Sequence, residues 1–412
     1  MRSALCAVRR SSSRVTDDTA MRDSDRGMRQ DTVSVPLPHH APRPAPRVAI
    51  IHDWLTGMRG GEKVLEEICA LYPDATLFTL VRVKGSVSPV IERHAIRTSW
   101  VQSLPRPGRW YRNYLPLFPS AVESMDLDDY DLVISSSHCA VKSVIPRGGA
   151  THVCYCHSPM RYAWDQFPAY FGPRQVGSAM SALLRPVMAG LARWDAATAG
   201  RVDRFLANSQ YVAGRIRRYY NRGSTVVYPP VDTHYFQPPP ENAQRERSAL
   251  VVSALVPYKR IEVAIDAARL AALPLRIVGR GPEEVRLRQF AGNAPVEFLG
   301  WKSTDEIRTL YQTSAVLLLP GVEDFGIVPV EAQACGTPVV ALAQGGALET
   351  VIDGVTGALV REGAPALADG IGRVLEAPAD VAAIRGNAER FSREAFRNAF
   401  ADAVAEASGA IS

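Results

Sequence analysis

The feature that most constrains the fold is an alternation of short apolar runs with helical stretches, which occurs twice along the chain. The first series begins at Val48 and the second at Leu250. Between them, three prolines at 238–240 and a charged run to Arg247 form an expected surface linker. Strands that alternate with helices imply parallel sheets with helical crossovers. We therefore predict an α/β protein with two Rossmann-like, doubly wound domains facing across a cleft.

The expected elements follow from the apolar runs and from their flanking prolines and glycines. In the first series, strands are expected at 48–51, 76–81, 132–135, 152–156, 205–207 and 225–228, with a loop at 52–61 and a helix at 62–71. In the second, strands are expected at 250–256, 275–278, 296–299, 315–319, 338–342 and 358–360, and helices at 260–272, 282–291, 304–312, 327–335 and 365–376. The predicted divisions are a disordered Pro-rich tail (1–46), an N-terminal domain (47–232), a C-terminal domain (248–385) and a last segment with a helix (386–412).

Composition excludes several other classes of protein. A chain of 412 residues that is 47% hydrophobic and 22% charged is not disordered throughout. A net charge of +5 suits an acidic substrate or a membrane surface, and is too weak to indicate a nucleic-acid partner. There is no apolar run of bilayer length and no secretory pattern, and the six cysteines are scattered. We expect a reduced, cytoplasmic protein.

Two carboxylates flank a predicted helix start that follows the strand at 315–319. Glu323 lies in the loop, and Glu331 lies in or near the first turn. Open α/β sheets bind ligands at this edge, and the backbone N–H groups at Gly326 and Ile327 offer an anion site. The carboxylates suit sugar or ribose hydroxyls. Alternatively, Glu331 only complements the helix dipole and Glu323 is solvated.

Further candidate ligands follow other strands. Lys259 and Arg260 begin a helix on the same edge as Glu323, where two cations suit a diphosphate, although such residues are often surface charges. The turn at Gly279 is a weak match to a dinucleotide fingerprint and favours close backbone approach to a nucleotide. Gly60 and Gly61 either cradle a phosphate or simply turn the chain.

His157 closes a strand and should face the cleft. It is a candidate to bind a hydroxyl or phosphate or to act as an acid or base, against the commoner structural role of a single histidine. Arg161, four residues later, is a candidate acceptor contact. Two metal alternatives are less favoured: zinc at His152, Cys154 and Cys156, and a metal at the Asp-Leu-Asp of 126–128.

Two segments have the pattern of a membrane-surface contact. Residues 100–118 interleave arginines, including Arg109 and Arg112, with aromatic residues. Residues 180–194 place an apolar stripe on a helix that also carries arginines. Such basic amphipathic stretches can lie on anionic lipid. The alternative is core packing with solvated arginines.

These residues carry a resemblance to a known family. The Glu323-x7-Glu331 pattern and the following Ala-Gln-Ala-Cys-Gly-Thr-Pro-Val of 332–339 resemble the retaining glycosyltransferases of family 4, which have the GT-B fold. The resemblance covers 47–405. Residues 52–63, 157–165 and 255–260 look like the branch of O-antigen and exopolysaccharide mannosyltransferases.

The resemblance implies roles for the matching positions. Glu331 would bind the ribose hydroxyls, and Lys259, with the backbone after Gly326, would hold the diphosphate. The candidate catalytic residues Glu323 and His157 would contact the transferred sugar. Two other segments would contact the donor, Gly60 and Gly61 at its phosphates and 298–301 at its base. A last helix at 390–405 would pack back across the first domain.

The implied activity is transfer, with retention, of a hexosyl group from a nucleotide sugar to a lipid-linked or polysaccharide acceptor. The implied donor is GDP-mannose, with no cofactor and no metal, and the enzyme would be cytoplasmic with peripheral contact at the inner face of the membrane. Alternatives are a UDP-sugar donor, an epimerase of similar architecture, or a catalytically weak sugar-nucleotide-binding subunit. The last is favoured by Ala254, where the family usually has arginine. NAD binding rests on the turn at Gly279 alone.

Overall fold

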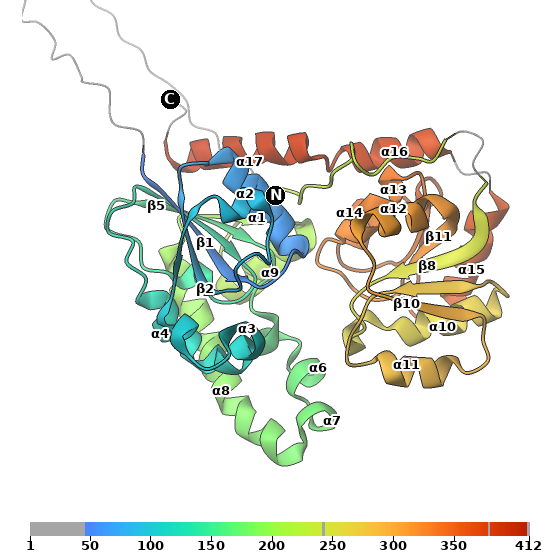
Figure 1. Ribbon diagram of the computed structural model, residues 1–412, viewed down its shortest axis with the longest axis horizontal. Helices are drawn as coiled ribbons and strands as arrows, with labels where there is room; N and C mark the ends of the chain where they lie inside the picture. Colours follow the sequence, from blue (N-terminus) through green and yellow to red (C-terminus); the bar gives the residue numbers. More distant parts are fainter. Residues whose placement is uncertain (1–45, 241–243, 378–379, 410–412) are drawn as a thin grey trace, which may run out of the picture. The chain divides into compact units, whose positions relative to one another are not determined.

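The protein is described by a computed structural model that covers residues 46–240, 244–377 and 380–409. Its strands form two sheets, and every strand pair in them is parallel (Figure 1). The predicted α/β fold with two Rossmann-like sheets is therefore confirmed. The predicted tail, apart from its last residue, lies outside the described residues.

The first sheet has the strand order β3-β2-β1-β4-β5-β6-β7, and the second has the order β10-β9-β8-β11-β12-β13. The strands of the first sheet are β1 (Val48–Leu55), β2 (Thr76–Arg82), β3 (Ala95–Thr98), β4 (Leu132–Ser137), β5 (Thr151–Cys156), β6 (Arg204–Ala207) and β7 (Thr225–Val226). Those of the second are β8 (Glu246–Val252), β9 (Leu275–Val278), β10 (Val296–Gly300), β11 (Ser314–Leu319), β12 (Val339–Leu342) and β13 (Gly357–Val360). We call the parts that form these sheets and their crossovers the first and the second lobe.

Helices connect the strands. Those up to β7 are α1 (Gly60–Leu71), α2 (Pro89–Glu92), α3 (Pro107–Trp110), α4 (Phe118–Glu123), α5 (Arg161–Trp164), α6 (Phe167–Phe171), α7 (Pro173–Val176), α8 (Ser178–Ala197) and α9 (Gln210–Tyr220). Those after it are α10 (Ile261–Leu270), α11 (Glu284–Ala291), α12 (Thr304–Thr313), α13 (Ile327–Ala334), α14 (Ala347–Thr350), α15 (Ala364–Glu376), α16 (Val381–Glu389) and α17 (Arg393–Ala407). Both faces of each sheet carry an apolar core, as expected for parallel sheets covered by crossover helices.

Strand β1 is longer than the predicted strand at 48–51, and the predicted loop at 52–61 was wrong for its first four residues. The sequence suggested a loop because His52 and Asp53 are polar. Both side chains are fully buried but have polar partners. Asp53 accepts hydrogen bonds from four consecutive backbone N–H groups, at 138–141, and His52 contacts Ser136. A buried polar side chain that is paired in this way is compatible with a central strand.

Two other sequence predictions differ from the structure. Strand β3 was not predicted, because it is a short edge strand whose side chains are mostly exposed and give no apolar run. The predicted strand at 250–256 ends at Val252 instead. Beyond it, the backbone of Ser253 and Leu255 packs closely on Gly279 and Gly281, where a β-carbon would clash with backbone atoms.

The two C-terminal helices pack on different lobes (Figure 1). Helix α16 packs on α13, and α17 packs on α1 and β5. Phe396 and Phe400 of α17 lie 5.8 and 6.2 Å from the Tyr155 ring. Arg393 and Arg397 pair with the buried Glu67 of α1. Helix α17 therefore completes the core of the first lobe.

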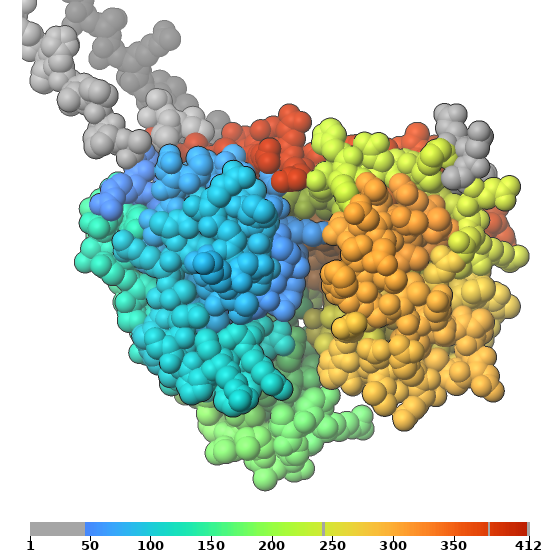
Figure 2. Space-filling view, in the orientation of Figure 1, coloured from blue at the N-terminus to red at the C-terminus, as the bar shows by residue number. Residues whose placement is uncertain are grey.

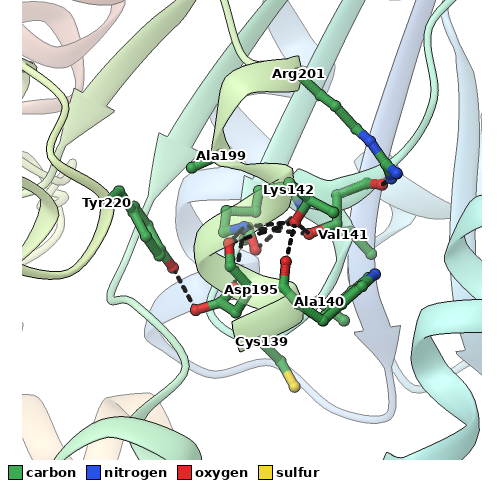
Figure 3. Close-up of polar contacts among 12 residues, drawn as sticks. Cys139, Ala140, Val141, Lys142, Asp195, Ala199, Arg201 and Tyr220 are labelled. Carbon is green, nitrogen blue, oxygen red and sulfur yellow. Dashed lines mark hydrogen bonds and ion pairs between the residues drawn. The ribbon is translucent and has the colours of Figure 1, made fainter. Parts of the chain in front are cut away.

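A buried ion pair anchors the long helix α8 to the first sheet. Lys142 and Asp195 are 1% and 0% exposed, and their charged atoms lie 3.0 Å apart. Figure 3 shows the Tyr220 hydroxyl on the same carboxylate, to which it donates at 2.9 Å. Trp164 donates to the same oxygen at 2.7 Å. Removal of either partner would be strongly destabilising, because it would leave an uncompensated charge in the core.

Candidate functional site

The residues predicted for the second lobe gather where its strands end. Lys259 lies in a single 3-10 turn (Pro257–Lys259) after β8 and forms an ion pair with Glu323, which follows β11. Both side chains are mostly buried. The Glu323 carbonyl accepts a hydrogen bond from Gly346 at 2.9 Å, so the backbone of this loop is fixed by the segment after β12.

Helix α13 begins directly after this loop. Gly326, the N-cap, has φ +92°, a conformation that strongly favours glycine. A β-carbon there would also lie 3.2 Å from the Pro329 ring. The N–H groups that start a helix have no intrahelical acceptors and carry the positive end of its dipole. The start of α13 is therefore suited to an anion.

At the start of α1 in the first lobe, Gly60 lies beside this helix start and Gly61 lies beside His157. A β-carbon at Gly60 would lie 3.1 Å from Cδ1 of Ile327, and one at Gly61 would lie 3.8 Å from the His157 ring. The structure thus brings Gly60, Gly61, His157 and Ile327 together from distant parts of the sequence. Larger residues at 60 and 61 would fill the space beside the start of α13 and beside the His157 ring.

Glu331 contacts a residue that sequence reasoning missed. It is the fifth residue of α13 and is 5% exposed. It accepts a hydrogen bond from the Tyr311 hydroxyl at 3.1 Å, and Lys63 Nζ of the first lobe lies 2.6 Å from its other oxygen. In the space-filling view, blue residues of the first lobe touch orange residues of the second (Figure 2). Lys63 follows Gly61 by two residues and Gly60 by three. This closeness to two predicted phosphate contacts was the sequence signal that could have identified Lys63 as a site residue.

His157 is a neutral group in this site. Burial, with a smaller contribution from His138, lowers its pKa to about 3. Its Nε2 lies 2.8 Å from Ser136 Oγ. Near neutral pH the ring therefore offers one N–H and one lone pair, and it serves as a hydrogen-bonding group rather than a cation.

The remaining predicted donor contacts have other partners. Arg260 pairs with the exposed Glu362 at 2.6 Å, so Lys259 and Arg260 do not converge on one point. Gly279 has φ +135° and lies against the backbone of Ser253, where no larger residue fits. Ala254 leaves no side-chain cation on this turn.

A second set of contacts joins the lobes beside Glu323. Asp324 is paired with Arg161 and Arg215 of the first lobe, the latter at 3.0 Å. These two arginines lower the pKa of Asp324 despite its burial, which acts in the opposite direction. Ser209 donates to the Asp324 carbonyl at 2.6 Å. Arg161, predicted as an acceptor or membrane contact, thus lies at the junction of the lobes.

A cavity of about 410 Å³ adjoins this junction. Polar, charged and aromatic side chains of both lobes dominate its walls, among them Arg161, Tyr211, Arg215, Tyr258, Asp324 and Gln344. Its two arginines are matched by Asp165 and Asp324, so its wall carries little net charge. Aromatic and hydrogen-bonding walls of this kind suit a neutral polar ligand better than an anion.

The predicted membrane-surface segments are divided between core and surface. Arg109 and Arg112 are exposed, beside Trp110 and Leu117, which are about 40% exposed. In contrast, Tyr111, Leu115 and Phe118 belong to the core of the first lobe. Helix α8 buries one face of its C-terminal half, through Met188, Leu191, Ala192 and Asp195, and exposes Met180 and Leu183 near its start. None of the helices in the described part of the chain is long and apolar enough to cross a bilayer.

The two metal alternatives find no support where the chain is described. His152 uses both ring nitrogens, on Ser135 Oγ at 2.8 Å and on the Arg201 carbonyl at 2.9 Å. Burial raises the pKa of the Cys154 thiol to about 12. Asp126 accepts a hydrogen bond from the Asp128 N–H in a local turn. Within residues 46–240, 244–377 and 380–409, no group of three or more His, Cys, Asp or Glu side chains could hold a metal ion.

Comparison with protein families gives two adjoining matches. Residues 58–235 match the model of Glycosyltransferase Family 4, and residues 236–391 match that of Glycosyl transferases group 1. Two similar curated proteins are an uncharacterized glycosyltransferase of Methanocaldococcus jannaschii and the D-inositol 3-phosphate glycosyltransferase of Mycobacterium tuberculosis. They are 29% identical over 167 residues and 34% identical over 180 residues. These matches cover 40% and 38% of this chain, and only 46% and 38% of the two relatives.

Solved structures are similar over most of the chain. HepE of Anabaena, in complex with UDP and glucose, has a TM-score of 0.64 at 22% identity, over 87% of this chain and 99% of that protein. Sucrose-phosphate synthase of Thermosynechococcus elongatus has a TM-score of 0.64 at 19% identity, over 88% of this chain and all of that protein. At such identities the likeness establishes the fold alone, which is GT-B.

Proposed function

Since this chain joins a family 4 glycosyltransferase domain to a group 1 glycosyltransferase domain in a GT-B fold, we propose that it is a retaining hexosyltransferase. Its donor is a nucleotide sugar, which we propose to be GDP-mannose. Its acceptor is a lipid-linked or polysaccharide glycan. The observation that carries this proposal is the meeting of Lys259, Glu323, the start of α13 and the Gly60-Gly61 turn at facing sheet edges.

The proposed reaction needs charge stabilisation rather than a protein nucleophile. The acceptor hydroxyl attacks C1 of the hexosyl group, the bond from C1 to the diphosphate oxygen breaks, and the hydroxyl proton passes to the leaving diphosphate. Attack from the face that the diphosphate leaves gives retention. Lys259 and the first N–H groups of α13 stabilise the charge that develops on the diphosphate.

The two carboxylates have distinct proposed roles. Glu331 would exchange its partner Lys63 for the ribose hydroxyls. Glu323 would exchange its partner Lys259 for hydroxyls of the hexosyl group, while the Lys259 ammonium turns to the diphosphate. Without a donor, each carboxylate is thus paired with a lysine ammonium group, and hydroxyl groups of the bound donor would replace that ammonium group. Lys63 also places a second ammonium group beside Glu331. This cation would compensate for the arginine that the family usually has at the position of Ala254.

A donor screen tests the proposal. The purified protein is incubated with GDP-mannose, other GDP-sugars and UDP-sugars, with and without EDTA, and binding, hydrolysis and transfer are measured for each. We expect GDP-mannose to be preferred and EDTA to have no effect, because Lys259 and the helix dipole take the role of a metal charge. Preference for a UDP-sugar would replace the proposed donor while leaving the proposed chemistry intact.

Two variants separate an enzyme from a binding subunit. Lys259→Met and Glu323→Gln should lower kcat/KM by about 10² to 10³, as expected for groups that stabilise charge in the transition state. Arg373→Met is the control, because Arg373 pairs at 3.6 Å with Asp353, both are exposed, and neither is among the residues assigned to the donor. Turnover that survives both site variants would indicate a sugar-nucleotide-binding subunit instead.

A further inference from the structure

Three histidines lie together at the ends of neighbouring strands in the first lobe. The rings of His52, His138 and His157 are 5.7 to 6.4 Å apart, centroid to centroid. Two of them, His52 and His157, line the Gly61 turn, within 3.7 to 3.9 Å of the position of a β-carbon there. The family resemblance implies a sugar contact for His157 alone, and it gives the other two histidines no role.

One hydroxyl group connects two of these rings. Ser136 Oγ lies 2.8 Å from Nε2 of His157 and 3.1 Å from Nδ1 of His52. A serine hydroxyl has a single proton, so it donates to one ring and accepts from the other. Burial lowers the pKa of both histidines to about 3, so both rings are neutral near pH 7. The tautomers of His52 and His157 are therefore coupled.

The far side of His52 faces a carboxylate. Its Nε2 lies 4.0 Å from Glu62 Oε1 and has no hydrogen-bond partner among the described residues. Ionised Glu62 favours a proton on this nitrogen. His52 Nδ1 then accepts from Ser136, and Ser136 accepts from Nε2–H of His157. In that arrangement His157 Nδ1, which makes no hydrogen bond within the described part of the chain, carries a lone pair.

Protonation of Glu62 removes this preference. The opposite arrangement then becomes available, in which His52 Nδ1 donates to Ser136 and Ser136 donates to His157. In that case Nδ1 of His157 carries the proton. Glu62 lies on α1 and does not touch the ring of His157, so its influence would pass through His52 and Ser136.

We propose that Glu62, His52 and Ser136 form a positioning relay that sets whether His157 Nδ1 offers a lone pair or a proton to a hydroxyl of the bound sugar. The sugar ligand rests on the proposed function, whereas the coupling of the two rings does not. Glu62, His52 and Ser136 are positioning residues, since none of them needs to touch the substrate.

Other charged groups face the relay from neighbouring elements. Asp53 is held by four backbone N–H groups, and His138 Nδ1 lies 3.2 Å from it. Arg59 faces Glu62, while Arg161 and Asp324 face His157. Burial raises the pKa of Glu62 to about 7, against the smaller effect of Arg59. The carboxyl is therefore protonated below about pH 7 and ionised above it, and the relay would respond within the neutral range.

The matched set of variants is Glu62→Gln, Ser136→Ala and Ser135→Ala. Glutamine still accepts the hydrogen bond that Glu62 takes from the Arg59 N–H at 3.0 Å, so the start of α1 is kept. Ser135 is the control, because its hydroxyl makes the same kind of bond, at 2.8 Å, to His152 on the opposite face of β4. Circular dichroism and melting temperature confirm that each variant folds.

The first measurement is the ¹⁵N NMR signal of His157 in the full-length protein, labelled at histidine, between pH 6 and 8. In the natural protein and in Ser135→Ala, we expect the ¹⁵N chemical shifts of His157 to report a change of tautomer around pH 7. The proton should lie on Nδ1 below this pH and on Nε2 above it. The change should be lost in Glu62→Gln and Ser136→Ala. A tautomer of His157 that follows pH identically in all four proteins would overturn the relay, whether or not the protein transfers sugar.

The second measurement is the pH profile of transfer. We expect an inflection of kcat near pH 7 that is absent in Glu62→Gln and Ser136→Ala. The donor KM should change by less than about twofold, because the relay sets whether His157 donates or accepts a hydrogen bond and does not alter the residues proposed to bind the diphosphate and the ribose. An inflection that persists in both variants contradicts the relay. Inactivity of every protein, with the NMR coupling intact, contradicts the proposed function instead.

Discussion

At the scale of single residues, the candidate site consists of charged groups that neutralise one another. Lys259 pairs with Glu323, and Lys63 pairs with Glu331. A polar ligand must therefore exchange for an existing partner, and its net gain is smaller than the number of its contacts suggests. The two pairs differ in exposure, since the Lys63 side chain is 40% exposed whereas that of Lys259 is 15% exposed.

The Lys63–Glu331 pair joins a half-exposed lysine to a buried carboxylate, so the two partners should differ in their effect on donor binding. Glu331→Ala should raise the donor KM by about 10- to 150-fold, because it removes a charged acceptor worth about 1.5 to 3 kcal/mol from the ribose hydroxyls of the proposed donor. Lys63→Met should change the donor KM by less than about fivefold, because a half-exposed ion pair contributes only about 0 to 1 kcal/mol. Steady-state kinetics with varied donor checks both. A larger effect at Lys63 than at Glu331 would place the ribose elsewhere.

At the scale of elements, the loop that carries Glu323 is shaped by the turn after β12. Gly345 and Gly346 run directly beside it, and a β-carbon at Gly346 would lie 2.3 Å from Cα of Phe325. The start of α13 and the side chain of Glu323 are therefore positioned by backbone-to-backbone packing that only glycine permits. Neither glycine was among the residues predicted from the sequence.

We accordingly predict that Gly346→Ala lowers kcat/KM at least tenfold while the protein remains folded, because the loop must shift to relieve the clash. The matched control is Gly372→Ala within α15, where a β-carbon meets no other atom within 4 Å. That variant should keep full activity and gain about 0.5 to 1 kcal/mol in free energy of unfolding from the helix preference of alanine. Equal activity of the two variants would exclude this role of the turn.

At the scale of the whole molecule, contacts between the lobes concentrate on Asp324. Its carboxylate is 9% exposed and lies between Arg161 and Arg215, and its backbone carbonyl accepts from Ser209. Nearby, the Glu349 carboxylate accepts from the first N–H groups of α9 in the other lobe, at 2.8 and 3.1 Å. Glu323, the neighbour of Asp324, depends on this junction for its position relative to the first lobe.

Asp324→Asn should therefore weaken the junction. Removing one partner of a buried ion pair typically costs about 3 to 5 kcal/mol. We expect a larger radius of gyration in small-angle X-ray scattering and a lower kcat. Glu284→Gln is the control, because Glu284 pairs with Arg288 on the exposed surface of α11 and should cost less than about 1 kcal/mol. An unchanged radius and kcat in Asp324→Asn would show that other contacts hold the lobes.

Stability against acid is also a property of the whole molecule. Burial lowers the pKa of His52 to about 3 and that of His152 to about 4, below the usual value of 6.5. The unfolded chain therefore binds more protons below pH 6.5, so these residues destabilise the fold as the pH falls from about 6.5 towards 4. Glu62 has the opposite sign, because its raised pKa favours the folded state as the pH falls through 7.

We predict that the melting temperature falls between pH 7 and pH 5, because several buried histidines with lowered pKa values act against Glu62. Glu62→Gln should make this fall steeper, since it removes an opposing contribution. Differential scanning calorimetry at a series of pH values measures both slopes. A melting temperature that rises on acidification would contradict the assignment of His52 and His152 as buried neutral groups.

The order of strands and helices, and with it the fold class, could be predicted from the sequence because each element is defined by local periodicity and by nearby prolines and glycines. The positions of Glu323 and Glu331 on either side of the start of α13 could also be predicted, because they follow from the local sequence. The limits of prediction were also local: β1 was cut short at two polar residues, and β3 left no apolar run.

The partners of the site residues were decided by the tertiary structure. Lys63 and Glu331 are 268 positions apart in the sequence, and Arg161 and Asp324 are 163 apart. The sequence pattern shows which face of an element is buried, but not which distant side chain meets it there. Ser135 and Ser136 illustrate this, because the alternation of side chains along β4 places them on opposite faces of the sheet. Ser136 contacts His52 and His157 only because β1 and β5 pack on either side of β4.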